Sequence, residues 1–262
     1  MAGKFIAIYG VNNIGKSTQT SLLVQRLVNV GVRVEYFKYP LYDLDPTGKM
    51  LNEILRGKQK RSVQSMIEFF EGTSVRRPNM KRKPSVVFRK QPIAPKEIRQ
   101  RVTEEELQMW YSLNRYQFDP QIRKKLASGI SIVAEDYTGT GLAWGDAKGA
   151  DLDWLVGVNK FLRKPDLEIL INGERFLAGK EKLHLHESSD RLIGKARKSF
   201  LKLAKKNRWR IVNANQSIEK VSEDIWQVVE QLFKKSEIYK SGDVARSIST
   251  FTSWQSKSTG SP

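Results

Sequence analysis

The sequence of 262 residues contains no cysteine and only two histidines. Without cysteine the chain forms no disulfide and no thiolate metal site, which fits a reducing cytoplasm. No apolar run approaches the roughly 20 residues that a membrane-spanning helix needs. The N-terminus, "MAGKFIAIYG", lacks the charged region, longer apolar stretch and cleavage site of a signal peptide. We therefore expect a globular cytoplasmic protein without a membrane segment.

Acidic residues are also in short supply. The chain has 46 Lys and Arg against 28 Asp and Glu, which gives a net charge of +18. Residues 56–101 alone contain 14 basic and 3 acidic residues, so this stretch supplies 14 − 3 = +11. Such a surface suits polyanions, including nucleic acid, nucleotides and anionic membrane, although a solvated loop that aids solubility explains the same composition.

The apolar residues that are present fall into short runs at 4–10, 33–40, 130–136, 166–173 and 209–214. Helix-like stretches separate these runs, among them 16–30, 104–118, 195–207 and 217–233. Near-continuous apolar strands that alternate with helices indicate a parallel sheet covered on both faces. Right-handed crossovers then give an α/β fold of three layers, α/β/α, with a five-stranded parallel sheet.

Two regions break this alternation. Residues 57–98 carry several prolines and dense charge, so we interpret them as a basic insertion with at most a short strand near Val86–Phe88. Residues 236–262 are rich in Ser, Thr and Gly, which predicts a disordered tail. A single domain is therefore expected over residues 1–235.

The stretch "GVNNIGKST" at residues 10–18 has the spacing G-x-x-x-x-G-K-[ST], with an apolar run before it and a helix-like stretch after it. Gly10 and Gly15 let the backbone N–H groups converge on phosphate oxygens. Lys16 reaches the β- and γ-phosphates, and Ser17 places its hydroxyl on Mg²⁺. This context predicts a P-loop. The remaining loop residues expected near the phosphates are Asn12, Asn13 and Thr18.

Segments further along the chain resemble the thymidylate kinase family, a group of P-loop nucleoside monophosphate kinases. "YSLNR" (111–115) resembles the family's F-S-A-N-R, and "EDYTGTGLAWGDAK" (135–148) resembles its D-R-Y-x-x-S-G-x-A-[FY] stretch. "LDW", "KPDLEIL" and "WRIVNANQSIEKV" follow in the family's order. The likeness runs from residue 4 to residue 233 and is interrupted by the basic insertion.

The resemblance implies transfer of the γ-phosphoryl group of ATP to a nucleoside monophosphate, usually dTMP, with Mg²⁺, as a step toward dTTP. It also suggests a homodimer. Such transfer needs in-line positioning and positive charge more than covalent chemistry.

The resemblance assigns roles on the acceptor side. Tyr111 matches the aromatic residue that stacks on the base, and Arg115 matches the arginine that hydrogen-bonds it. Tyr137 matches an aromatic residue against the deoxyribose, and Pro40 matches the proline before the acceptor loop. Each also has a plainer explanation: Tyr111 and Tyr137 as core residues, and Arg115 as a surface ion-pair partner.

Glu135 takes the place of the family's aspartate at the end of a strand. A carboxylate there can orient Mg²⁺-bound water or accept a proton from the acceptor, although a helix-capping or ion-pairing acid fits the same position. Gly139 and Gly141 suit a tight turn under the ligand, or backbone geometry alone.

A lid is expected at about residues 174–198. The family's catalytic arginine comes from the P-loop or from the lid, and because the P-loop has Asn13 here, the role should fall to the lid. The candidates are Arg175, Arg191 and Arg197, with Lys195 behind them, and each also fits a solvated basic face. Beyond the fifth strand, Ala214 and Asn215 should pass beside the adenine.

Three positions depart from the family pattern. Asn12 stands where the family has its P-loop acid. Asp136 stands where the family has the arginine that holds the acceptor's phosphate, and Tyr42 stands where it has the acceptor-loop arginine. A contact between unit charges about 4 Å apart is worth up to ~4 kcal/mol at an effective dielectric near 20, before desolvation. These changes are large enough to reverse the site's preference for a phosphate.

Three hypotheses account for the departures. We favour the first, in which another cation has taken over, with the basic insertion as its source and Asp136 bound to Mg²⁺ or a lysine. In the second, the acceptor carries no phosphate, and the enzyme is a deoxynucleoside kinase with Glu135 as base. In the third, the chain is a nucleic-acid-binding P-loop protein, whose binding should weaken steeply with salt.

Overall fold

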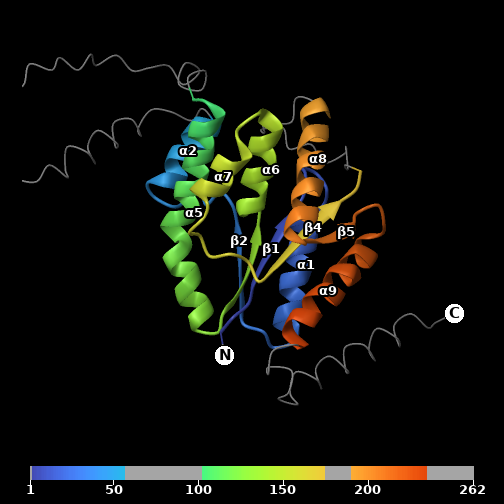
Figure 1. Ribbon diagram of the computed structural model, residues 1–262. Coiled ribbons are helices and arrows are strands. Elements are labelled where there is room, and N and C mark those ends of the chain that lie inside the picture. The colour runs from blue at the N-terminus through green and yellow to red at the C-terminus, as the bar shows by residue number, and fades with distance from the viewer. Residues whose placement is uncertain (1, 57–101, 175–189, 235–262) are drawn as a thin grey trace, which may run out of the picture.

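The computed structural model describes residues 2–56, 102–174 and 190–234, and within them a five-stranded parallel sheet forms the centre (Figure 1). Its strands lie in the order β2-β3-β1-β4-β5. Their bounds are β1 Phe5–Tyr9, β2 Val34–Lys38, β3 Ser131–Glu135, β4 Leu167–Asn172 and β5 Arg210–Asn213. Each strand falls inside an apolar run that the sequence predicted.

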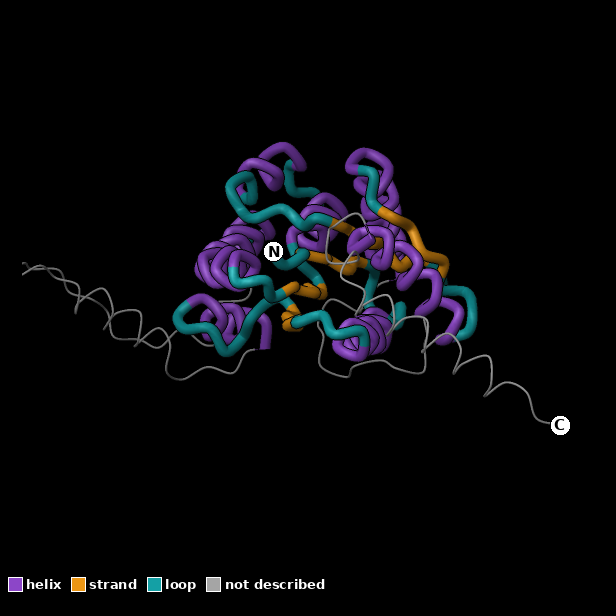
Figure 2. Tube along the Cα trace, turned by 90° about the horizontal axis from the view of Figure 1, so that it is seen from below, coloured by secondary structure: helices purple, strands orange, loops and turns teal. Residues whose placement is uncertain are grey.

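Helices cover both faces of the sheet. Helices α1 and α9 contact each other, and α1 packs on β1, β2 and β3 while α9 packs on β4 and β5. Helices α5, α6 and α8 form the other layer, in which α6 contacts both neighbours. Figure 2 shows helices on either side of the strands. The predicted three-layer α/β/α fold is therefore confirmed. The helices are α1 Lys16–Asn29, α2 Thr47–Arg56, α5 Glu104–Ala127, α6 Thr138–Lys148, α7 Leu152–Val158, α8 Asp190–Asn207 and α9 Ile218–Lys234.

The central strand β1 is completely buried from Phe5 to Tyr9, because both faces lie under helices. It pairs with β3 and β4, and Ile8 lies opposite Glu135 on one side and Ile169 on the other. The carboxyl ends of β1 and β3 therefore lie side by side, and the P-loop meets the residues that follow Glu135. In open parallel sheets ligands bind at this end of the strands.

A second, smaller apolar cluster joins α2 to α5. Leu51 and Ile54 of α2 and Leu107 of α5 are its buried members. Helix α5 begins with a capping box, in which Thr103 and Glu106 each accept a hydrogen bond from the other's backbone N–H. This cluster fixes the first half of α5, the half that carries Tyr111 and Arg115.

Helix α6 corrects the expectation of a tight turn at Gly139 and Gly141. Both residues are helical, and neither has a positive φ. A Cβ on Gly139 would lie 2.6 Å from Trp209 Cη2 and 2.7 Å from Tyr9 Cε2. Gly139 therefore allows α6 to pack closely on an aromatic pair, and no turn is involved.

The expected insertion at 57–98 and the tail at 236–262 lie outside the described residues. Residues 190–198, assigned to the lid region, form the first half of α8. Within the described part of the chain, none of the helices has the length and apolar character needed to cross a membrane.

We predict that Gly139→Ala lowers the free energy of unfolding by about 1–3 kcal/mol, because the added methyl group overpacks against Tyr9 and Trp209. Gly157→Ala on α7 is the matched control, since a Cβ there meets nothing within 4 Å. The control should be neutral or more stable by up to about 1 kcal/mol. Urea denaturation of both variants measures the difference, and equal stabilities would contradict the packing role of Gly139.

Candidate active site

The P-loop connects the buried strand β1 to the first turn of α1. Gly10, Asn13 and Gly15 adopt positive φ angles of 154°, 60° and 88°. A Cβ on Gly10 would lie 2.7 Å from the Ile171 carbonyl oxygen, so glycine permits a close approach of two backbones there. The loop curls as the sequence predicted, with Asn12 half-buried and Thr18 exposed.

Lys16 lies inside this loop, and its side chain is only 6% exposed. Its Nζ donates to the carbonyl oxygens of Gly10 and Val11, each at 3.0 Å. The same atom lies 3.7 Å from Asp136 Oδ1. The structure therefore brings together the P-loop lysine and the aspartate that stands in the place of the family's arginine.

Asp136 follows β3 with a φ of 62°, a left-handed conformation that aspartate tolerates better than most residues. Its Oδ1 accepts a hydrogen bond from Thr140 Oγ1 at 3.0 Å. Burial raises the pKa of this carboxyl, while the nearby Lys16 ammonium acts in the opposite direction. The sequence offered Mg²⁺ or a lysine as the partner of Asp136, and Lys16 lies within ion-pair distance of it.

Glu135 is the most deeply buried carboxylate of the site, with an exposure of 1%. Its Oε1 accepts from Ser17 Oγ at 2.9 Å and lies 3.2 Å from Lys38 Nζ. Its Oε2 accepts from Tyr36 Oη at 2.8 Å. The Lys38 Nζ also donates to Ser17 Oγ at 3.1 Å. The sequence did not predict Tyr36 and Lys38 as site residues. Their spacing of two residues on β2 places both side chains on the same face of the strand, and this spacing was the available indication.

Ser17 and Glu135 offer hydroxyl and carboxylate oxygens, the donors that Mg²⁺ prefers. The described residues contain no group of three or more His, Cys, Asp or Glu that could hold a metal alone. In nucleotide sites Mg²⁺ takes one or two protein oxygens together with phosphate oxygens and water. The donor set fits the implied ion.

Arg115 lies on α5 and is 3% exposed. Its Nη1 donates to Asn159 Oδ1 at 3.3 Å, whereas its buried Nε has no hydrogen-bond partner. Burial lowers the pKa of this guanidinium, although neighbouring tyrosines act against the shift. Gly141 faces it so closely that a Cβ would lie 3.0 Å from Nη2. Arg115 is thus no surface ion-pair partner, and it retains unused donor capacity.

Tyr111 is half-buried one turn before Arg115. Burial is the largest cause that raises the pKa of its phenol, followed by the charges of Tyr42 and Glu104. Tyr42 packs against the same apolar cluster as Tyr111. Three of the predicted acceptor residues, Tyr42, Tyr111 and Arg115, therefore belong to one neighbourhood.

Asn114 lies between Tyr111 and Arg115 in the sequence of α5 and is completely buried. It was not predicted as a site residue. Its amide accepts from Leu41 N at 2.8 Å and donates to Leu41 O at 3.0 Å. It also donates to Thr47 Oγ1 at 3.0 Å. One side chain therefore attaches the loop after Pro40 to helix α5.

Tyr137 has no exposed surface. Its ring contacts Phe5 and Tyr39, with centroid distances of 5.0 and 5.2 Å, and its hydroxyl donates to the Arg163 carbonyl oxygen at 3.2 Å. These contacts favour the plainer explanation of Tyr137 as a core residue. Pro40 is half-buried directly after β2.

The two described lid candidates differ in their surroundings. Arg197 is half-buried, and its Nε donates to Asn172 Oδ1 at 2.8 Å, at the carboxyl end of β4. Arg191 is exposed. Arg175 lies outside the described residues. Arg197 is therefore the candidate that the fold holds at the functional edge of the sheet.

The predicted adenine segment follows β5. Ala214 is 3% exposed. Asn215 Oδ1 accepts from Glu174 N at 2.7 Å, and Asn215 N donates to Asn213 Oδ1 at 3.0 Å. The first of these bonds joins the segments that follow β4 and β5.

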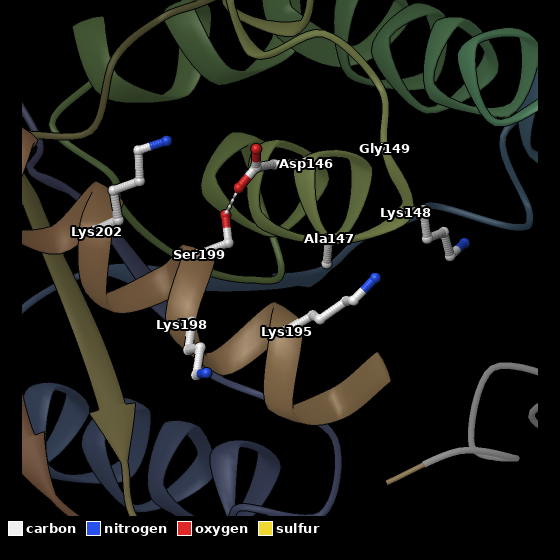
Figure 3. A pocket seen from close by; sticks show the side chains of 8 residues that line it. All are labelled: Asp146, Ala147, Lys148, Gly149, Lys195, Lys198, Ser199 and Lys202. Carbon is white, nitrogen blue, oxygen red and sulfur yellow. Dashed lines mark hydrogen bonds between the residues drawn. The ribbon is translucent and has the colours of Figure 1, made fainter. Parts of the chain in front are cut away.

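A cleft of about 410 Å³ lies elsewhere, between the end of α6 and α8 (Figure 3). It is lined by Asp146, Ala147, Lys148, Gly149, Lys195, Lys198, Ser199 and Lys202. None of these residues belongs to the P-loop or to the Glu135 cluster.

A P-loop at the end of the central strand, with a lysine inside it and a serine bonded to a buried carboxylate, defines the class of P-loop nucleotide-binding proteins. A sequence model of thymidylate kinase matches residues 93–225, slightly more than half of the chain. The chain belongs to the thymidylate kinase family, and it is a nucleoside monophosphate kinase.

Individual relatives agree with this assignment. The thymidylate kinase of Homo sapiens is 28% identical over 228 residues, which cover 85% of this chain and 88% of that protein. The thymidylate kinase of Dictyostelium discoideum is 25% identical and covers 90% of this chain and 89% of its own length. A solved structure of thymidylate kinase from Candida albicans has the same fold, with a TM-score of 0.63, 21% identity, and coverage of 90% of this chain and 94% of that one.

We predict that Lys16→Ala abolishes phosphoryl transfer, with kcat at least about 10³-fold lower, because the donor phosphates lose their cation. The fold should remain, since the core does not include this side chain. Lys160→Ala, which removes a lysine beside Phe161, is the control. A coupled assay for ADP with circular dichroism checks both, and full activity of Lys16→Ala would rule out the kinase assignment of this loop.

Proposed function

We propose that the enzyme transfers the γ-phosphoryl group of ATP to dTMP and forms dTDP and ADP, with Mg²⁺ as the metal. The observation that carries this proposal is the cluster of Lys16, Ser17 and Glu135 at the mouth of the P-loop. The family assignment supports the choice of acceptor, and the deoxynucleoside-kinase and nucleic-acid alternatives are not favoured.

On the donor side, the loop N–H groups and Lys16 bind the β- and γ-phosphates. Ser17 and Glu135 would hold Mg²⁺, which neutralises charge on the phosphates when bound. Asp136 holds the Lys16 ammonium at the carboxyl end of β3 through their 3.7 Å ion pair. Arg197, at the end of β4, is the cation that we propose for the transferring group.

On the acceptor side, we assign the base to Arg115 and Tyr111. A buried guanidinium with an unpartnered Nε is costly unless a further acceptor binds it. A carbonyl oxygen of thymine supplies such an acceptor, while Tyr111 offers the ring face. Gly141 keeps the space beside Arg115 free, because any side chain there would contact the guanidinium.

The remaining expectations rest on the family resemblance or, for the location, on the lack of cysteine and of signal-peptide features. The homodimer, the cytoplasmic location and the adenine contacts of Ala214 and Asn215 stay predictions. A sedimentation measurement addresses the first of these.

We predict that the enzyme phosphorylates dTMP but not thymidine when ATP and Mg²⁺ are present, and that EDTA stops the reaction. Chromatography of the nucleotide products measures both reactions, with dUMP, dCMP and dGMP included to define the base preference. Product from thymidine without product from dTMP would refute the proposal and support a deoxynucleoside kinase instead.

A further inference from the structure

Lys38 ends β2 and makes contacts that no part of the proposed mechanism uses. Its ammonium lies 3.1 Å from Ser17 Oγ and 3.2 Å from Glu135 Oε1. These are the two oxygens assigned to Mg²⁺ above. The lysine side chain is 49% exposed, whereas the carboxylate is 1% exposed. A cationic group of the chain thus bridges the proposed metal ligands.

The lysine and the metal compete for these oxygens. Magnesium binds oxygen at about 2.0–2.1 Å in an octahedral shell. A divalent ion bound to the same two atoms would repel an ammonium group within hydrogen-bond distance of them. Movement of Lys38 away from the metal relieves this repulsion, and its flexible, half-exposed side chain permits such a movement.

The acceptor's phosphate is the natural second partner for Lys38. Asp136 stands where the family has its phosphate-binding arginine, and its neighbour Lys16 serves the donor phosphates. Lys38 is close enough to Asp136 that its charge affects that carboxyl. At the carboxyl end of β2, Lys38 therefore offers a cation close to the position where the arginine is missing.

We propose that Lys38 alternates between two partners: it bridges Ser17 and Glu135 before the metal binds, and it holds the phosphate of the acceptor afterwards. The proposal rests on the proposed function. It assigns the compensating cation to β2, whereas the sequence suggested the basic insertion.

The test compares Lys38→Met, which keeps the length and removes the charge, with Lys38→Arg, which keeps the charge. We expect Lys38→Met to bind Mn²⁺ several-fold more tightly in electron paramagnetic resonance titrations with a non-hydrolysable ATP analogue. In calorimetry it should bind dTMP about 10- to 100-fold more weakly, with thymidine binding unchanged, because only dTMP offers a charged phosphate. Lys38→Arg should retain dTMP binding.

Unchanged or weaker Mn²⁺ binding by Lys38→Met would overturn the proposal, and so would equal losses for dTMP and thymidine. Lys220→Met on α9 controls for loss of a surface charge, since the Lys220 ammonium pairs with Asp224 at 2.6 Å and lies outside the proposed site. If Lys38→Met does not fold, Lys38→Gln gives the same comparison. A wild-type enzyme that neither binds nor phosphorylates dTMP would instead refute the proposed function, a separate outcome.

An independent observation concerns the exposed face of α8. Arg191, Lys195, Lys198, Lys202 and Lys205 are all exposed and follow at alternating spacings of four and three residues. Side chains at these spacings share one face of a helix. The row of five cations, called the α8 basic row below, covers about 21 Å at 1.5 Å per residue. Figure 3 shows its three central lysines beside the cleft against α6.

The α8 basic row has no acidic partners within the described residues. By contrast, Lys220 and Lys234 of α9 pair with Asp224 and Glu230, each at 2.6 Å. The acid that lines the cleft, Asp146, accepts a hydrogen bond from Ser199 Oγ at 2.6 Å. Lys148, across the cleft, pairs with Glu104 at 2.9 Å. Among the residues that the structure describes, the cations of the row therefore form no ion pair.

We infer that the α8 basic row binds the phosphate backbone of a nucleic acid strand. The row is longer than one triphosphate group, so it suits a ligand with many phosphate groups spaced along a chain. Its face carries no exposed apolar side chain to anchor in a membrane and no aromatic side chain to stack on bases. Binding should therefore be independent of sequence and strongly dependent on salt.

The test uses a labelled single-stranded DNA 20-mer and the triple variant Lys198→Gln/Lys202→Gln/Lys205→Gln. The control Lys124→Gln/Lys220→Gln/Lys234→Gln has the same net charge. We expect the α8 variant alone to bind at least about tenfold more weakly, and to lower the slope of log K against log salt by about 3. The kinase activity of both should be unchanged. Equal losses in the two variants, or a preference of the row for anionic vesicles over DNA, would overturn the inference.

Discussion

The buried carboxylate of Glu135 is the group around which the active site is built. An ionised acid with 1% exposure is stable only if its oxygens are paired and hydrogen-bonded. Ser17, Tyr36 and Lys38 supply those partners from α1 and β2. One charge therefore fixes the start of the P-loop helix relative to the carboxyl ends of two strands. The relative positions of the P-loop, β2 and β3 thus follow from the need to give the Glu135 carboxylate hydrogen-bond and ion-pair partners.

The acceptor side depends on a second buried polar group, the amide of Asn114. It bonds both backbone groups of Leu41 and the hydroxyl of Thr47, so the loop between β2 and α2 follows the position of α5. Because Tyr111 and Arg115 lie on the same helix as Asn114, the helix that carries the residues proposed to recognise the base also holds this loop. Recognition and loop position are thereby linked by one helix.

The sequence predicted the features that local patterns encode. The strands were found from apolar runs, and the P-loop was found from glycine and lysine spacing. The contacts of Asn114 with Leu41 and of Tyr36 with Glu135 join residues 73 and 99 positions apart, which no local pattern reports. The turn expected at Gly139 was wrong for a related reason, because glycine there serves close packing against Trp209, and that partner is known only from the fold. Tyr137 matched a family motif, but its surroundings place it in the core.

The close packing at Gly139 also bears on how the enzyme can move. Tyr9 is the last residue of β1 and is followed directly by Gly10 of the P-loop, while its ring and that of Trp209, with centroids 4.6 Å apart, both lie against Gly139. Helix α6 is thus packed tightly against Tyr9, the residue that directly precedes the P-loop. The P-loop and α6 should therefore behave as one rigid body. Arg115 packs against this body through its contact with Gly141. The β2–α2 loop is held separately from this body, by the hydrogen bonds of Asn114 to Leu41 and Thr47.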